Sequence, residues 1–70
     1  MTVSTLEMAK ELVDEIGADK VHSVYQYINA NNDKKMYAVF IASDFVDIHN
    51  SPYVKDPVLL FLDGKWITIK

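Results

Sequence analysis

The chain has 70 residues, of which half are apolar, ten are acidic and seven are basic, and its formal net charge is −3. All the basic residues are lysines and there is no cysteine, so disulfides and zinc sites built from thiolates are excluded. A chain of this length builds one small core, and we expect a single small α+β domain over residues 1–70.

The first predicted element is an amphipathic helix over about residues 5–16. Ser4 and Glu7 have the spacing of a capping box, in which two side chains satisfy backbone amides at the start of a helix. Gly17 is the expected stop. Apolar residues recur between them at helical spacing: Leu6, Ala9, Leu12, Val13 and Ile16. The opposite side of this helix is acidic, and we interpret it as a solvated surface.

Residues 21–29 fit two patterns. Four residues have the spacing of one helical face: Val21, Val24, Tyr25 and Ile28. The stretch is nevertheless rich in β-branched and aromatic residues, which favour a strand. We favour the strand. The polar residues 29–34 then form a turn. The unbroken apolar run 36–42 predicts a central strand, because a strand that is apolar on both faces is covered on both.

The last predicted element is a β-hairpin over residues 58–69. Its loop is Asp63 and Gly64, a pair that favours the tight type I′ turn. With a two-residue loop, Phe61 faces Trp66 across the strands, and Leu60 and Ile67 share the other face. A three-residue loop with a bulge would shift this pairing by one residue. Together these elements predict an N-terminal amphipathic helix packed on a small antiparallel sheet, in the order α-β-β-β-β.

One helix covers only one face of such a sheet. The hairpin is apolar on both faces, and we expect the face that carries Leu59, Phe61 and Trp66 to be left without a helix. With a neighbouring strand, these three residues would form an exposed apolar patch that rivals the maximum of roughly 300–600 Å² on typical monomers. Either the connection 43–57 folds back over this face, or another chain covers it, with Trp66 at or beside the contact.

The connection 43–57 also holds most of the side chains that could carry chemistry. Asp44, Asp47, His49 and Asp56 lie within it, but their spacing matches neither a calcium loop nor a zinc motif. The histidines have no cysteine nucleophile, and the two glycines are too far apart to form a phosphate loop. We therefore expect no catalytic residue, no bound metal and no cofactor.

The absence of arginine and the acidic balance argue against nucleic acid as a partner. No apolar run approaches the roughly 20 residues of a membrane helix, and residues 1–4 do not resemble a signal peptide. We expect a cytoplasmic chain that has no membrane or nucleic-acid partner.

The leading hypothesis is a protein-binding domain that acts by stoichiometric association, as inhibitors, immunity proteins, anti-defence factors and accessory subunits do. The alternatives are a structural homodimer and a small metal-dependent enzyme centred on Asp44, Asp47 and His49. Exposed aromatic residues are the preferred anchors of protein interfaces. The predicted partner-binding residues lie on the sheet or in the connection: Trp66, Phe61, Leu59, Tyr53, Asp47 and His49.

Overall fold

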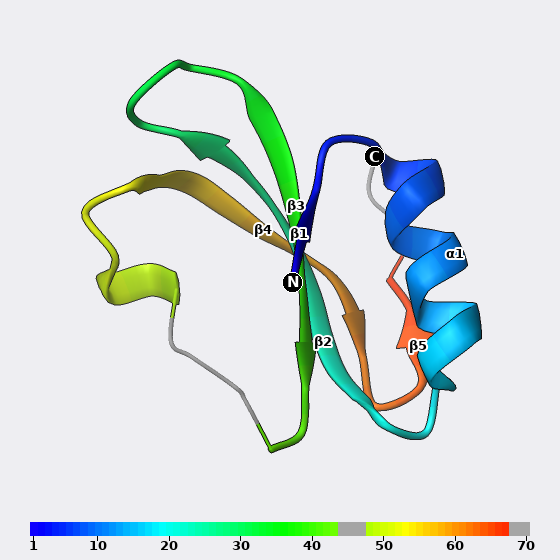
Figure 1. The fold of residues 1–70 in the computed structure, drawn as a ribbon. Helices are drawn as coiled ribbons and strands as arrows, with labels where there is room; N and C mark the ends of the chain where they lie inside the picture. Colours follow the sequence, from blue (N-terminus) through cyan, green and yellow to red (C-terminus); the bar gives the residue numbers. More distant parts are fainter. Residues whose placement is uncertain (44–47, 68–70) are drawn as a thin grey trace.

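The computed structural model describes residues 1–43 and 48–67. In this part of the chain one helix packs on an antiparallel sheet of five strands in the order β1-β3-β2-β4-β5 (Figure 1). The elements are β1 (Thr2–Val3), α1 (Leu6–Ile16), β2 (Val21–Asn29), β3 (Lys35–Ile41), the 3-10 helix η1 (Ile48–Asn50), β4 (Val54–Leu62) and β5 (Lys65–Trp66). The predicted α+β class and the predicted helix are confirmed, and β1 is an addition.

The cap of α1 differs from the prediction. Thr5, not Ser4, is the N-cap: its hydroxyl accepts a hydrogen bond from the Met8 amide at 3.2 Å. The Ser4 hydroxyl contacts the Met8 sulfur at 3.6 Å instead. Both residues have a hydroxyl, and the point at which the chain leaves β1 decides which of them reaches the first turn. Gly17 ends α1 as predicted, with a φ of 102° that favours glycine.

We expect Thr5→Ala to lower the free energy of unfolding by about 1 kcal/mol, because the Met8 amide loses its acceptor. Ser4→Ala is the matched control and should cost much less, since a hydroxyl contact to a thioether is weak. Urea denaturation followed by circular dichroism measures both variants. Equal losses for the two would contradict the assigned cap.

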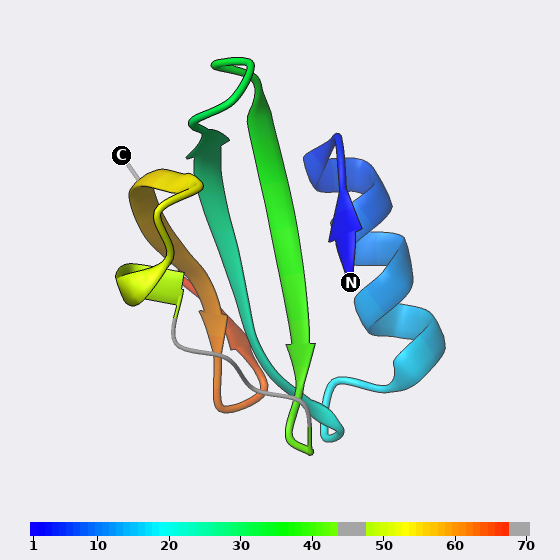
Figure 2. The ribbon, with the colours of Figure 1, turned by 60° about the vertical axis from the view of Figure 1, so that its left-hand side comes forward.

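Residues 21–29 form a strand, as favoured by their composition, and β2 lies at the centre of the sheet between β3 and β4. The predicted strand 36–42 is β3, and its outer neighbour is β1, which pairs with Tyr37 and Ala38. Strand β1 was not predicted, because a strand of two residues is too short to show an alternating pattern in the sequence. The twisted strands β2, β3 and β4 run side by side through the molecule (Figure 2).

Strand β4 begins at Val54, earlier than the predicted hairpin strand. Pro57 lies inside it, because a bulge interrupts the pairing with β2 at this point: Gln26 pairs with Val58, whereas Ile28 pairs with Lys55. The hairpin is confirmed next to its loop, where β5 ends at Trp66. Its two-residue loop aligns Phe61 with Trp66 and Leu62 with Lys65. The predicted pairs that involve residues 68 and 69 lie outside the described residues.

The core lies between α1 and one face of the sheet. Ala9 and Val13 are buried against this face, and its fully buried residues include Val24 and Phe61. The expectation that Phe61 and Trp66 share a face without a helix was wrong. Strict alternation groups Leu59 with Phe61, but the β2–β4 pairing shifts by one residue between them, so Leu59 points away from α1 while Leu60 and Phe61 both join the core.

Candidate functional site

The face of the sheet opposite α1, which we call the distal face, carries a second and smaller apolar cluster. The rings of Tyr25 on β2 and Phe40 on β3 meet edge to face with centroids 6.1 Å apart. Leu59 on β4 is the register partner of Tyr25, and directly opposed residues of antiparallel strands point to the same side. Three neighbouring strands therefore contribute apolar side chains to the distal face.

The short helix η1 packs over part of this face. Ile48 is buried, and the His49 ring stands edge-on to the Tyr25 ring with centroids 5.7 Å apart. In Figure 1, α1 and η1 lie on opposite sides of the sheet. Of the two predicted alternatives, cover by the connection 43–57 holds for residues 48–50, but the face they pack on carries Leu59 and neither Phe61 nor Trp66.

Tyr53 follows η1 in the same connection. Its carbonyl accepts a hydrogen bond from the Ala30 amide at 2.9 Å, which ties the connection to the end of the sheet. Its side chain is 60% exposed, the largest exposed fraction among the large apolar and aromatic residues that the structure describes. The backbone at this position is anchored while the aromatic side chain faces solvent.

The predicted partner-binding residues separate into two groups. His49 and Leu59 lie on the distal side with Tyr53 beside them, whereas Phe61 and Trp66 lie on the side of α1. Phe61 is fully buried, so it is not an accessible contact residue. Asp47 lies outside the described residues.

Trp66 packs over the main core and shields it from solvent. Its ring meets the Phe61 ring edge to face with centroids 5.0 Å apart, and the Lys10 ammonium lies 5.8 Å from the Trp66 ring centre. This cation–π geometry connects β5 to α1. Trp66 is still 39% exposed, so it remains a candidate contact residue, but on the opposite side of the sheet from Tyr53 and His49.

Tyr25 and Phe40 are residues of the distal face that sequence analysis did not single out. Their neighbours Val24 and Val39 belong to the main core, and alternation along β2 and β3 places the following residues on the other side. The alternation was visible in the sequence once the strands were assigned. Which set faces α1 was not.

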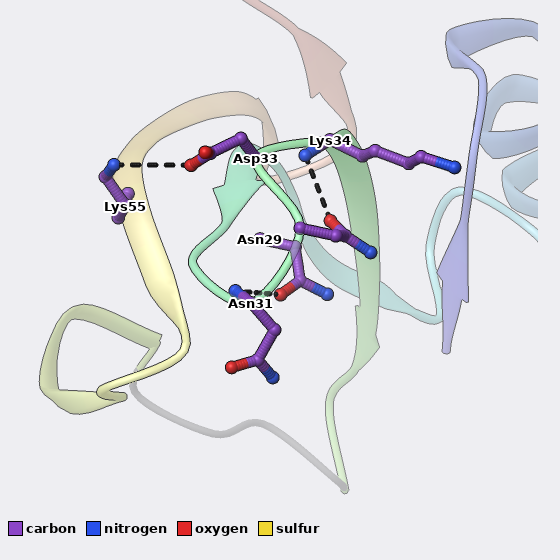
Figure 3. Close-up of polar contacts among 6 residues, drawn as sticks. Asn29, Asn31, Asp33, Lys34 and Lys55 are labelled. Carbon is purple, nitrogen blue, oxygen red and sulfur yellow. Dashed lines mark hydrogen bonds and ion pairs between the residues drawn. The ribbon is translucent and has the colours of Figure 1, made fainter.

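The β2–β3 turn forms one end of the sheet and is held by short-range polar contacts (Figure 3). The Asn29 side chain accepts a hydrogen bond from the Asn31 amide at 2.9 Å, and the ammonium of Lys55 lies 3.5 Å from the carboxylate of Asp33. The ion pair joins the turn to β4. Its two side chains are more than half exposed, so we expect a small contribution to stability.

The opposite end of the sheet has two adjoining open depressions, of about 650 and 460 Å³. Asp19, His22 and Asp63 are among the residues that line the larger one. His22 also lies 3.0 Å from the hydroxyl of Ser23, which is fully buried. Within residues 1–43 and 48–67, no three His, Cys, Asp or Glu side chains are placed to hold a metal ion.

None of the helices in the described ranges is long and apolar enough to span a bilayer. Comparison of the chain with protein-family models, with curated proteins and with solved structures found no match.

Proposed function

We propose that this chain is a small cytoplasmic protein-binding domain that acts by stoichiometric association through its distal face. The observation that carries this proposal is the convergence of Tyr25, Phe40 and Leu59 with the segment that leads through His49 to Tyr53. These residues come from three strands and one connection. Tyr25, Phe40 and Leu59 are partly exposed, and His49 and Tyr53 are exposed.

Aromatic side chains are favoured at protein interfaces because they bury a large area at a low cost in conformational entropy. Tyr53 has the properties of such an anchor. Its ring is mostly exposed, and its backbone is tied to Ala30, so binding would order little of the main chain. Inhibitors, immunity proteins, anti-defence factors and accessory subunits all act by association of this kind.

The test compares two exposed aromatic residues on opposite sides of the sheet. Tagged wild-type protein is used to capture partners from a native lysate, and affinity for the captured protein is then measured for Tyr53→Ala and Trp66→Ala. We expect Tyr53→Ala to weaken binding by about thirtyfold, the effect of a typical hot-spot residue. Trp66→Ala should change it by less than about threefold, as expected of a residue outside the interface.

Melting curves of both variants serve as the folding control, and Tyr53→Ala should melt close to the wild type because its side chain is mostly exposed. Loss of binding in Trp66→Ala alone, in a folded variant, would move the interface to the side of α1. Sedimentation of the wild type measures the alternative, because a homodimer that Tyr53→Ala dissociates would make the partner a second copy of this chain.

A further inference from the structure

A row of three side chains crosses the sheet close to the β2–β3 turn. Ile28 on β2 pairs with Lys35 on β3 and with Lys55 on β4. Directly opposed residues point to the same side, so the three side chains form one row with the apolar residue between two ammonium groups. We call these residues the tip row. It lies on the α1 side of the sheet, since alternation along β2 places Ile28 on the same side as the core residue Val24.

Helix α1 does not cover the tip row. Lys35 and Lys55 are exposed and Ile28 is half-buried, whereas Val24, four residues before Ile28 on the same strand, is completely buried. Figure 1 shows the β2–β3 turn at the end of the sheet farthest from α1. The tip row is therefore an open part of a face whose other half is the core.

Positive charge is concentrated at this end of the molecule. Lys34 precedes Lys35 and is also exposed, and Figure 3 shows its side chain extending away from the pair that Lys55 forms with Asp33. Lys55 remains 55% exposed within that pair. Three lysines near the turn are accompanied by two acidic residues, Asp33 and Asp56. This end of the molecule is therefore positive, although the net charge of the chain is −3.

The outer side of α1 has the opposite charge. It carries Glu7, Glu11, Asp14 and Glu15, all exposed, while Lys10 lies over the Trp66 ring. An acidic partner is repelled by α1 and attracted by the tip row. Charge separation of this kind orients a partner during encounter and excludes the wrong approach.

We infer that the tip row binds an acidic segment of the protein partner, with carboxylates at Lys35 and Lys55 and an apolar side chain on Ile28. This inference rests on the proposed protein-binding function and adds a contact on the α1 side, reached around the end of the sheet at which Tyr53 bonds to Ala30. Three lysines beside two carboxylates suit a short acidic peptide better than nucleic acid, whose binding normally needs a longer basic surface and arginine. A second copy of this chain is a poor occupant. The acidic α1 of one chain would bind the tip row of the next, and such head-to-tail contacts do not produce a closed dimer.

The test uses two short synthetic peptides, oligo-glutamate and oligo-lysine, each with one central leucine, and an oligothymidine of similar length. Each probe is titrated into the isotopically labelled full chain, and amide chemical shifts are followed by NMR. We expect oligo-glutamate to shift the amides of Ile28, Lys35 and Lys55, and oligo-lysine to leave them unchanged. Raising the salt from low to physiological concentration should weaken the effect, because these charges are exposed.

The double variant Lys35→Glu/Lys55→Glu should weaken oligo-glutamate binding by roughly tenfold, since two attractions become repulsions. Its matched control is Lys20→Glu/Lys65→Glu, which makes the same change in net charge near the opposite end of the sheet. The control should bind within about twofold of the wild type, as expected if long-range charge is screened by salt.

Three results would overturn the inference: equal weakening in both double variants, shifts spread over every lysine, or tighter binding of the oligothymidine to the same amides. Self-association abolished by the tip variant would also overturn it, in favour of a second copy. The proposed function fails separately. If binding of the captured protein is lost in Tyr53→Ala but unchanged in Lys35→Glu/Lys55→Glu, only the tip-row inference is refuted. If the peptide binds but no protein is captured from the lysate, the proposed function is refuted.

Discussion

Replacing Phe61 with alanine is expected to leave the protein largely unfolded at room temperature. Phe61 is the largest completely buried side chain that the structure describes, and it lies in the cluster formed with Ala9 and Val13 of α1. Truncating a buried phenylalanine typically costs about 3–5 kcal/mol. A core of this size seldom supplies more than about 3–5 kcal/mol in total, so one substitution removes most of the stability.

Urea denaturation followed by far-ultraviolet circular dichroism measures this effect. Phe61→Leu is the conservative control and should retain a cooperative transition, because leucine keeps most of the buried volume. Trp66→Ala should cost less than Phe61→Ala, since the Trp66 ring is already 39% exposed. A folded Phe61→Ala variant with a midpoint above that of Trp66→Ala would contradict the assignment of Phe61 to the core.

The second large effect is expected at Ile48, the buried residue of η1. Ile48→Ala should lower the free energy of unfolding by about 2 kcal/mol, at the low end of the range for buried isoleucine, because the site lies near the surface and can partly collapse. The substitution also loosens the cover of the distal face. Amide hydrogen exchange in β2 around Tyr25 should therefore accelerate more than exchange in α1.

His49→Ala is the neighbouring control. His49 is exposed and its ring makes an edge contact with Tyr25, so its truncation should cost less than that of the buried Ile48, about 1 kcal/mol for an aromatic pair. If Ile48→Ala left both the unfolding midpoint and the exchange rates unchanged, η1 would not be packed on the sheet. The distal face would then be more open than the structure shows.

Several elements were predictable because their physics is local. The helical spacing from Leu6 to Ile16 and the stop at Gly17 depend on residues within a few turns of each other. The hairpin depends on Asp63 and Gly64, whose positive φ values suit the tight turn that aligns Phe61 with Trp66. In each case the interacting groups are close in sequence, so their spacing alone specified the structure.

The candidate site was less predictable. His49, Leu59 and Tyr53 were expected to contact a partner, and they lie on or beside one face, but Tyr25 and Phe40 complete that face from two other strands. The grouping follows from pairing between distant segments. The aromatic character of single residues does not reveal which distant segments pair.

The sequence by itself determined the α+β class, the extent of α1 and the register of the β4–β5 hairpin, because short-range spacing and turn chemistry control them. Only the tertiary structure decided that β1 joins the outer edge of β3 and that the bulge at Asp56 and Pro57 lets β4 extend back to Val54. It also decided which hairpin face meets α1. That outcome follows from the shift in the β2–β4 pairing, which puts Leu59 on the distal face and both Leu60 and Phe61 in the core, whereas strict alternation groups Leu59 with Phe61.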